Sequence, residues 1–303
     1  MGATGSVSPV PVSEPVGIGH FWKLQSFGRH IGRALNYVLL AIGSFVFMIP
    51  FYWMVTTSIK DIRETYRFPP TFIPQSFTLA AYKAAWEFSP WLVYLQNTML
   101  ITASVLIGTV LSSTLCAYGF ARIRFKGRNL LFMGILATMM LPSQVTLIPT
   151  YLVFRSLGWL DTLKPLIIPA FFGGGPFFIF LMRQFFSTIP MDLEDAARID
   201  GCGFLRIYWH VMLPLVKPTL ATIAIFTFMG VWNNFMGPLI YVNDERLFPL
   251  ALGIFKLSLD TRTGQDVALM MSGAFIMTLP IILLFFFVQR YFIQGISFTG
   301  MKG

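Results

Sequence analysis

The chain has 303 residues, of which 55% are hydrophobic and only 12% are charged, whereas soluble proteins carry about 25% charged residues. This composition, with 32 phenylalanines, excludes a soluble globular domain and predicts an all-α integral membrane protein. The net charge of +9 does not indicate nucleic-acid binding, because the basic residues form no single cluster and membrane topology accounts for them. The two cysteines, in no CxxC or Cys/His pattern, suggest neither a disulfide framework nor a metal site.

Six charge-free apolar runs, each long enough to cross a bilayer, follow one another along the chain. They predict a six-helix transmembrane domain over residues 34–295, with spans at about 35–57, 92–118, 129–153, 165–187, 218–242 and 267–291. Residues 1–33 are predicted to form an N-terminal tail, disordered at least to about residue 19, because its first part is rich in Pro, Gly and Ser. Residues 296–303 are predicted to form a C-terminal tail.

The Lys and Arg residues of the loops predict the orientation, because cytoplasmic loops are enriched in both. The shortest loop, 122–128, carries four basic residues and no acid. We therefore expect both termini and the loop 190–217 to be cytoplasmic. On the outer side, residues 77–82 are predicted to form a short helix at the membrane surface.

Two spans contain residues that would interrupt an apolar helix. In the third span, Pro142, Ser143 and Gln144 begin a polar, kinked band. The fourth span contains Gly173-Gly174-Gly175-Pro176, which a membrane tolerates where neighbouring helices or cavity water satisfy the freed backbone. That run predicts either a kink beside a translocation pathway or close helix packing through small residues.

The fifth span contains Trp232-Asn233-Asn234-Phe235, and two adjacent amides in hydrocarbon are costly unless they face a partner or water. They either line a solute path or hydrogen-bond between helices. The candidate substrate-pathway residues are therefore Gln144, Gly174, Trp232, Asn233 and Asn234.

The longest polar interruption in the second half is the loop 190–217. Asp192 can act as the N-cap of a short helix, and negative charge in its first turn is favourable. Gly201 is predicted to end this helix in the left-handed conformation. A second amphipathic helix is predicted to stop at Leu213-Pro214, and the small residues of the first helix are expected to face outward.

The series Asp195-Ala196-Ala197, Gly201 and Val211-x-Leu213-Pro214 resembles the EAA loop of bacterial ABC importer permeases, EAA-x3-G-x9-I-x-LP. Asp195 stands where Glu is usual and Val211 where Ile is usual. Three further stretches are similar to the carbohydrate (multi-sugar, maltose-type) class of these permeases. They are residues 117–127, the Trp232-Asn233 pair (with Asn234 in place of the usual acid) and the end Gly300-Met301-Lys302-Gly303.

The resemblance implies the type I ABC importer permease fold with a cytoplasmic coupling helix, in a bacterial cytoplasmic (inner) membrane. It implies a second related permease subunit, two ATP-binding subunits, an extracytoplasmic solute-binding protein and membrane lipid as partners, and no nucleic acid. It also implies a set of residues that couple to the ATPase: Glu194, Asp195, Ala196, Ala197, Asp200, Gly201, Leu213 and Pro214.

The chain contains no GxxxxGK[ST] phosphate loop, so ATP and Mg are expected on the partner ATPase subunits. Because it contains no plausible Ser/His/Asp or Cys/His set either, we expect a transporter subunit rather than an enzyme. The expected function is ATP-driven import of a sugar or oligosaccharide. Import of glycerol-3-phosphate or a polyol remains an alternative. A membrane-anchored scaffold protein is disfavoured, because it would not need the polar bands in the third and fifth spans. An ion-coupled secondary transporter is disfavoured, because the charge-free runs have no mid-membrane carboxylates.

Overall fold

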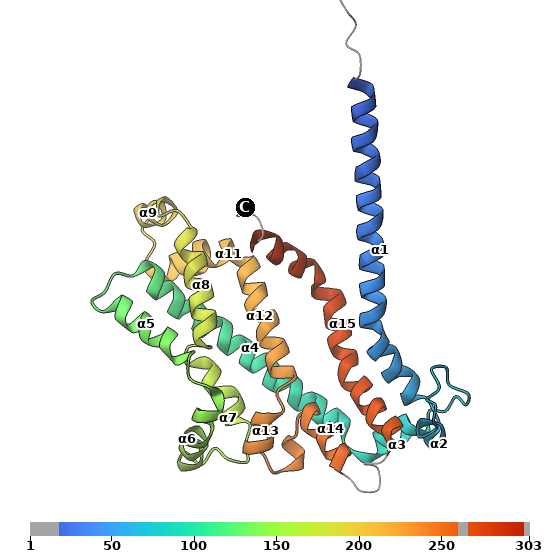
Figure 1. The fold of residues 1–303 in the computed structure, drawn as a ribbon. Helices are drawn as coiled ribbons and strands as arrows, with labels where there is room; N and C mark the ends of the chain where they lie inside the picture. Colours follow the sequence, from blue (N-terminus) through green and yellow to red (C-terminus); the bar gives the residue numbers. More distant parts are fainter. Residues whose placement is uncertain (1–17, 260–265, 300–303) are drawn as a thin grey trace, which may run out of the picture. The chain divides into compact units, whose positions relative to one another are not determined.

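The computed structural model describes residues 18–259 and 266–299, and no β-strand occurs within those residues (Figure 1). The predicted disorder of residues 1–17 and the terminal motif 300–303 lie outside the described residues. The chain divides after Trp53 into two units. Helix α1 (Ile18–Ser58) supplies the first unit and continues past Pro50 without a break.

The second unit contains the remaining helices. They are α2 (Ile62–Thr65), α3 (Ala80–Phe88), α4 (Trp91–Arg122), α5 (Arg128–Thr138), α6 (Ser143–Ser156), α7 (Lys164–Ile167), η1 (Ile168–Phe171), α8 (Pro176–Thr188), α9 (Asp192–Ile199), α10 (Phe204–Ile207), η2 (Tyr208–Met212), α11 (Leu213–Leu215), α12 (Lys217–Trp232), α13 (Met236–Tyr241), η3 (Glu245–Leu247), α14 (Leu250–Leu259) and α15 (Val267–Thr299).

Helix α4 is the centre of this unit, because α5, α7, α8, α12 and α14 all pack against it (Figure 1). Its 32 residues contain no proline, so the helix runs unbroken from Trp91 to Arg122. Small residues allow close approach to its neighbours, which is how helices associate where lipid removes the hydrophobic driving force. The ring of Phe171 in η1, for example, covers Gly108.

Three helical stretches of the described chain are long and apolar enough to cross a membrane: Gly32–Ser58, Trp91–Arg122 and Lys164–Thr188. Two bent pairs raise the number to five if each is a single span. One pair is α5 and α6, which meet at 100° where the third span was expected to be kinked. Pro142 accounts for that break, because it has no N–H and disfavours helical geometry at the preceding residue. The count of six spans stays a prediction.

The fourth span is interrupted at its glycine run, and a pathway beside this kink stays a prediction. Gly173, Gly174 and Gly175 have φ of +104°, +63° and +111°, which residues with a Cβ rarely adopt. The carbonyl of Ala170, freed by the break, accepts a hydrogen bond of 2.8 Å from Ser112 Oγ on α4. A hydroxyl on the neighbouring helix thus satisfies the backbone, as a membrane interior requires.

The loop between α1 and α4 is organised by the carboxylate of Glu64. It accepts hydrogen bonds from Thr71 Oγ1 at 2.7 Å, from the Gln75 N–H at 2.9 Å and from the N–H and hydroxyl of Ser76. These donors, Thr71 first, lower the pKa of Glu64 to about 2. The surface helix expected at 77–82 occurs three residues later, as α3.

Loops of the second unit that are distant in sequence contact each other at both ends of the bundle. Asp161, in the α6–α7 loop, accepts hydrogen bonds from the N–H groups of Asn243 and Asp244 after α13. At the opposite end of α4, Arg122 contacts Glu194 of α9. The expected outer loops therefore contact each other, and so do the expected inner loops.

Candidate functional site

Helix α9 ends where the sequence predicts. Gly201 has φ +79°, and its N–H donates to the carbonyl of Arg198 at 2.9 Å. The following N–H, of Cys202, donates to the carbonyl of Ala197, also at 2.9 Å. These two nested hydrogen bonds form a Schellman motif, which satisfies carbonyls that the helix end would leave unpaired. The prediction of a left-handed Gly201 is confirmed.

The start of α9 differs from the prediction that Asp192 is the N-cap. Met191 occupies the N-cap position, and its carbonyl accepts the N–H groups of Glu194 and Asp195 at 2.9 and 3.0 Å. Asp192 is already the first helical residue, and no side-chain capping bond is formed. Its charge still lies in the first turn, where the helix dipole favours it by roughly 0.3–1 kcal/mol.

The side chain of Glu194 is fully buried and forms an ion pair with Arg122, the last residue of α4. Glu194 Oε1 lies 3.0 Å from Arg122 Nε, and the two side chains are 0% and 4% exposed. Burial raises the pKa of Glu194, and the guanidinium groups of Arg122 and Arg198 oppose that rise. Removing one partner of such a pair leaves an uncompensated buried charge, which costs about 3–5 kcal/mol.

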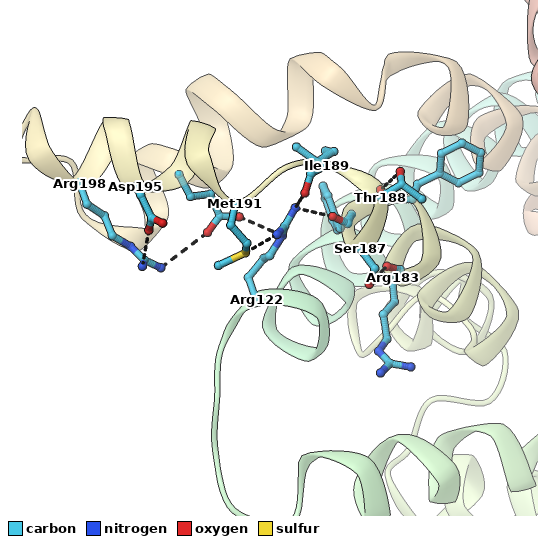
Figure 2. A network of polar contacts seen from close by, with 11 residues as sticks. Arg122, Arg183, Ser187, Thr188, Ile189, Met191, Asp195 and Arg198 are labelled. Atoms are coloured by element: carbon cyan, nitrogen blue, oxygen red, sulfur yellow. Dashed lines mark hydrogen bonds and ion pairs between the residues drawn. The ribbon is translucent and has the colours of Figure 1, made fainter.

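The guanidinium of Arg122 also holds the end of α8. Figure 2 shows it between Ile189 and Met191, with its Nη2 donating to the carbonyls of Phe186 at 2.5 Å and Ile189 at 2.6 Å. Its Nη1 contacts the sulfur of Met191. Sequence reasoning missed this role, because Arg122 was counted only as a loop base. The available signal was its place within the family-like stretch 117–127.

The two adjacent alanines of α9 lie on different faces of the helix. Ala197 lies one turn after Glu194 on the buried face and belongs to a core cluster that includes Phe186 and Tyr208. Ala196 is exposed. The expectation that both alanines face outward is therefore wrong for Ala197, because residues three apart on a helix share a face and Glu194 is anchored inward.

The exposed face of α9 is mixed in character. Its members are Asp192, Leu193, Asp195, Ala196, Arg198, Ile199 and Asp200. Ile199 is 88% exposed. Asp195 Oδ1 pairs with Arg198 Nη1 at 3.2 Å, and such surface pairs contribute at most about 1 kcal/mol. Asp200 is the C-cap and donates its N–H to the carbonyl of Ala196.

The second helix of the loop does not stop at Leu213-Pro214. It passes from α10 through the π-helical turn η2 into α11, and ends at Leu215. A π turn widens the helix just before Pro214, whose ring would otherwise clash with the carbonyl four residues earlier. Leu213 packs against the same core as Ala197, and Pro214 is exposed.

That core fixes the loop to α4 and α8. Tyr118 of α4 has its ring centroid 5.9 Å from that of Phe186 and 5.4 Å from that of Tyr208. The hydroxyl of Tyr208 lies 2.6 Å from Thr114 Oγ1 of α4. Aromatic pairs at these distances contribute about 0.5–1.5 kcal/mol beyond burial. Both helices of the loop are therefore seated on the same end of α4.

Among the predicted pathway residues, Gly174 and Trp232 are packing residues in this structure. A Cβ on Gly174 would lie 2.6 Å from the carbonyl oxygen of Thr109, so the glycine is required for the approach of the broken helix to α4. Trp232 is 3% exposed, and its ring stacks on Phe228 at 5.1 Å.

The three predicted polar pathway residues lie at helix ends. Gln144 is exposed near the start of α6. Asn233 is exposed and caps α12, with Nδ2 donating to the carbonyl of Met229 at 2.9 Å. Asn234 Oδ1 accepts the N–H of Gly237 at 3.1 Å and so bridges the break between α12 and α13. Within residues 18–259 and 266–299, no cluster of His, Cys, Asp or Glu is arranged to hold a metal.

The fold and the α9 loop together define a multi-pass, all-helical membrane permease of the type I ABC importer fold. The family profile of the binding-protein-dependent transport system inner membrane component matches residues 108–298, so the chain belongs to that family.

Relatives cover most of the chain. A probable ABC transporter permease protein, YurM of Bacillus subtilis, is 33% identical over 90% of each chain. The arabinooligosaccharide transport permease AraQ of Halalkalibacterium halodurans is 32% identical over 88% of this chain and 96% of the relative. A bacterial ABC transporter involved in alginate import has a similar structure, with a TM-score of 0.77 and 26% identity over 88% of this chain and 98% of that chain.

Proposed function

We propose that this chain is the permease subunit through which a sugar or oligosaccharide is imported. The observation that carries the proposal is the family membership together with relatives whose names specify arabinooligosaccharide, maltodextrin and diacetylchitobiose uptake. Those substrates are all oligosaccharides, and the similar alginate importer also moves a polysaccharide. This pattern favours a sugar over glycerol-3-phosphate, a polyol or an ion-coupled mechanism.

The exposed face of α9 is the proposed docking surface for an ATP-binding subunit. It combines the acids Asp192 and Asp195 with the apolar Leu193 and Ile199 around the small Ala196, so a partner helix or groove can approach closely. Glu194, Ala197, Gly201 and Leu213, by contrast, shape and seat the loop. ATP and Mg would be bound by two such partner subunits, and hydrolysis would act on this chain through α9.

The orientation proposed is with both termini and α9 in the cytoplasm. The four basic residues of 122–128 support it, because that loop lies at the α9 end of the bundle. A solute-binding protein would then contact the opposite end, and a second, related permease would complete the pathway. Asn233 is proposed to face that pathway, since it is exposed at a helix break.

Reconstitution tests the proposal. The chain is co-expressed with its genomic neighbours, purified in detergent and inserted in proteoliposomes. Uptake of a labelled oligosaccharide should require ATP inside and the binding protein outside. Asn233→Leu should reduce uptake while the complex stays assembled. Uptake that continues without ATP would contradict the proposal, and loss of assembly in Asn233→Leu would assign that residue to packing.

A further inference from the structure

The Arg122–Glu194 ion pair connects α9 to a helix that is not its neighbour in sequence. Helices α8 and α10 are joined to α9 by short backbone links, so a displacement of α9 reaches them through the chain itself. Helix α4 has no such link. It meets α9 through this charge pair, which is buried from water and therefore little screened.

We propose that Arg122 is a positioning residue that transmits a displacement of α9 into α4. This inference rests on the proposed function, because it assumes that an ATP-binding subunit moves α9. The Arg122–Glu194 pair then connects α9, which receives the movement, to α4, the central helix of the second unit.

The geometry explains why arginine is suited to this role. One planar guanidinium reaches the Glu194 carboxylate on α9, the carbonyls of Phe186 and Ile189 at the end of α8, and its own helix through the side-chain stem (Figure 2). Three elements are thereby held at one point. A lysine ammonium carries its donors on a single nitrogen and cannot span the same set of acceptors.

Helix α4 is placed to carry the movement across the molecule. It is unbroken over 32 residues, which corresponds to roughly 48 Å. At its far end the hydroxyl of Tyr94 donates to Glu245 at 2.6 Å, and Asn97 Nδ2 donates to the carbonyls of Arg246 and Phe248. A movement at Arg122 therefore reaches the loops between α13 and α14 through one rigid element.

A set of four variants separates transmission from stability. Arg122→Met leaves the buried Glu194 carboxylate with Arg198 alone, at 3.6 Å, and Glu194→Met leaves the buried Arg122 guanidinium without its carboxylate. Both variants should therefore lower thermal stability as well as coupling. The double variant Arg122→Met/Glu194→Met removes both charges and should recover most of the stability lost in Glu194→Met, since apolar residues can replace a buried pair. The part not recovered corresponds to the hydrogen bonds that Arg122 donates to the carbonyls of Phe186 and Ile189. Arg124→Met, an exposed residue of the adjoining loop, is the matched control.

The measurement is the ATPase activity of the complete complex in proteoliposomes, with and without loaded binding protein. We expect the double variant to be assembled and stable but to have lost stimulation by the binding protein, while Arg124→Met is stimulated like the wild type. Arg122→Lys, which keeps the charge, should remain assembled with reduced stimulation. Full stimulation in the double variant or in Arg122→Lys would overturn the inference. A wild-type complex without stimulation would instead contradict the proposed function.

Discussion

The two adjacent alanines of α9 lie in opposite environments, and this decides what each can do. Ala197 is covered by the core that contains Phe186 and Tyr208, whereas Ala196 faces solvent. A large side chain at the first position must displace packed aromatic rings. At the second position it extends the exposed surface and leaves the fold intact.

We expect Ala197→Trp to destabilise the protein by about 1–3 kcal/mol or more through overpacking. Ala196→Trp should leave thermal stability unchanged and prevent the ATP-binding subunit from docking. Thermal denaturation in detergent and retention of the ATPase during purification measure the two effects separately. Equal loss of stability in both variants would contradict the assignment of the two faces.

Gly201 tests the helix end alone. No atom lies within 4 Å of the position that its Cβ would occupy, so a substitution there costs only backbone strain. Gly201→Val should cost about 1–2 kcal/mol, re-aim α9 and reduce binding-protein-stimulated ATPase activity. Gly201→Asn is the control, because asparagine tolerates the left-handed region. Equal coupling in the two variants would mean that the turn does not set the position of α9.

The sequence predicted the local conformation of the α9 loop better than the contacts that its residues make with other helices. Gly201 was expected in the left-handed conformation from its place after a short amphipathic helix, because glycine has no Cβ and adopts that conformation without strain. The burial of Glu194 could not be predicted, because its partner Arg122 lies on a helix distant in sequence. A pattern within one segment carries no information about which charge another segment will bring to it.

At the level of helices, the contact between α4 and the broken fourth span depends on Gly174. Its φ of +63° and the 2.6 Å that would separate its Cβ from the Thr109 carbonyl oxygen both exclude a side chain. Close approach of this kind is what holds helices together in lipid.

Gly174→Ala should therefore destabilise the bundle by roughly 2–4 kcal/mol, from strain and overlap together. Gly119→Ala, on α4 with no atom within 4 Å, should be neutral or slightly stabilising. Thermal unfolding in the same detergent compares them. A solute-path role without a packing role would show as impaired uptake at unchanged stability in Gly174→Ala.

Helix breaks were predictable in position but not in angle. Pro142 and the Gly173–Gly175 run indicated breaks, since each removes a hydrogen bond or a Cβ. The 100° bend between α5 and α6 depends on what the two halves pack against, and that information is not local. The same lack of information about packing partners meant that the sequence could not decide whether Asn233 and Asn234 form hydrogen bonds or line a solute path.

At the scale of the whole molecule, the side of the membrane that each of the two loop groups faces can be measured directly. Contacts sort the loops into two groups, and the basic loop 122–128 belongs to the α9 group. We expect that an impermeant thiol reagent added to intact cells will not label Lys126→Cys and will label Arg246→Cys. The background comes from the two native cysteines, of which Cys116 is exposed in the single chain, so a Cys116→Ala/Cys202→Ala parent is the control. The reverse labelling would invert the topology.

The fold class followed from composition, and the family followed from the seven fixed positions of the EAA-x3-G-x9-I-x-LP pattern, because both are properties of the sequence itself. The number of spans that the helices make and the residues that line the solute path depend on partner chains and on lipid.

The π turn before Pro214 affects which way the side chains after it point. The nine residues between Gly201 and Val211 set a distance along the chain, and because most of them are helical they also set a rotation about the helix axis. A π turn holds one extra residue, so deleting a residue from 208–212 would restore an α-helix and leave Leu213 pointing in nearly the same direction. Deleting a residue from α10 would instead turn Leu213 by about 100° relative to Gly203, and the side chains that seat the loop would point elsewhere. Two deletions of equal length on either side of Tyr208 should therefore have opposite effects on the seating of the loop.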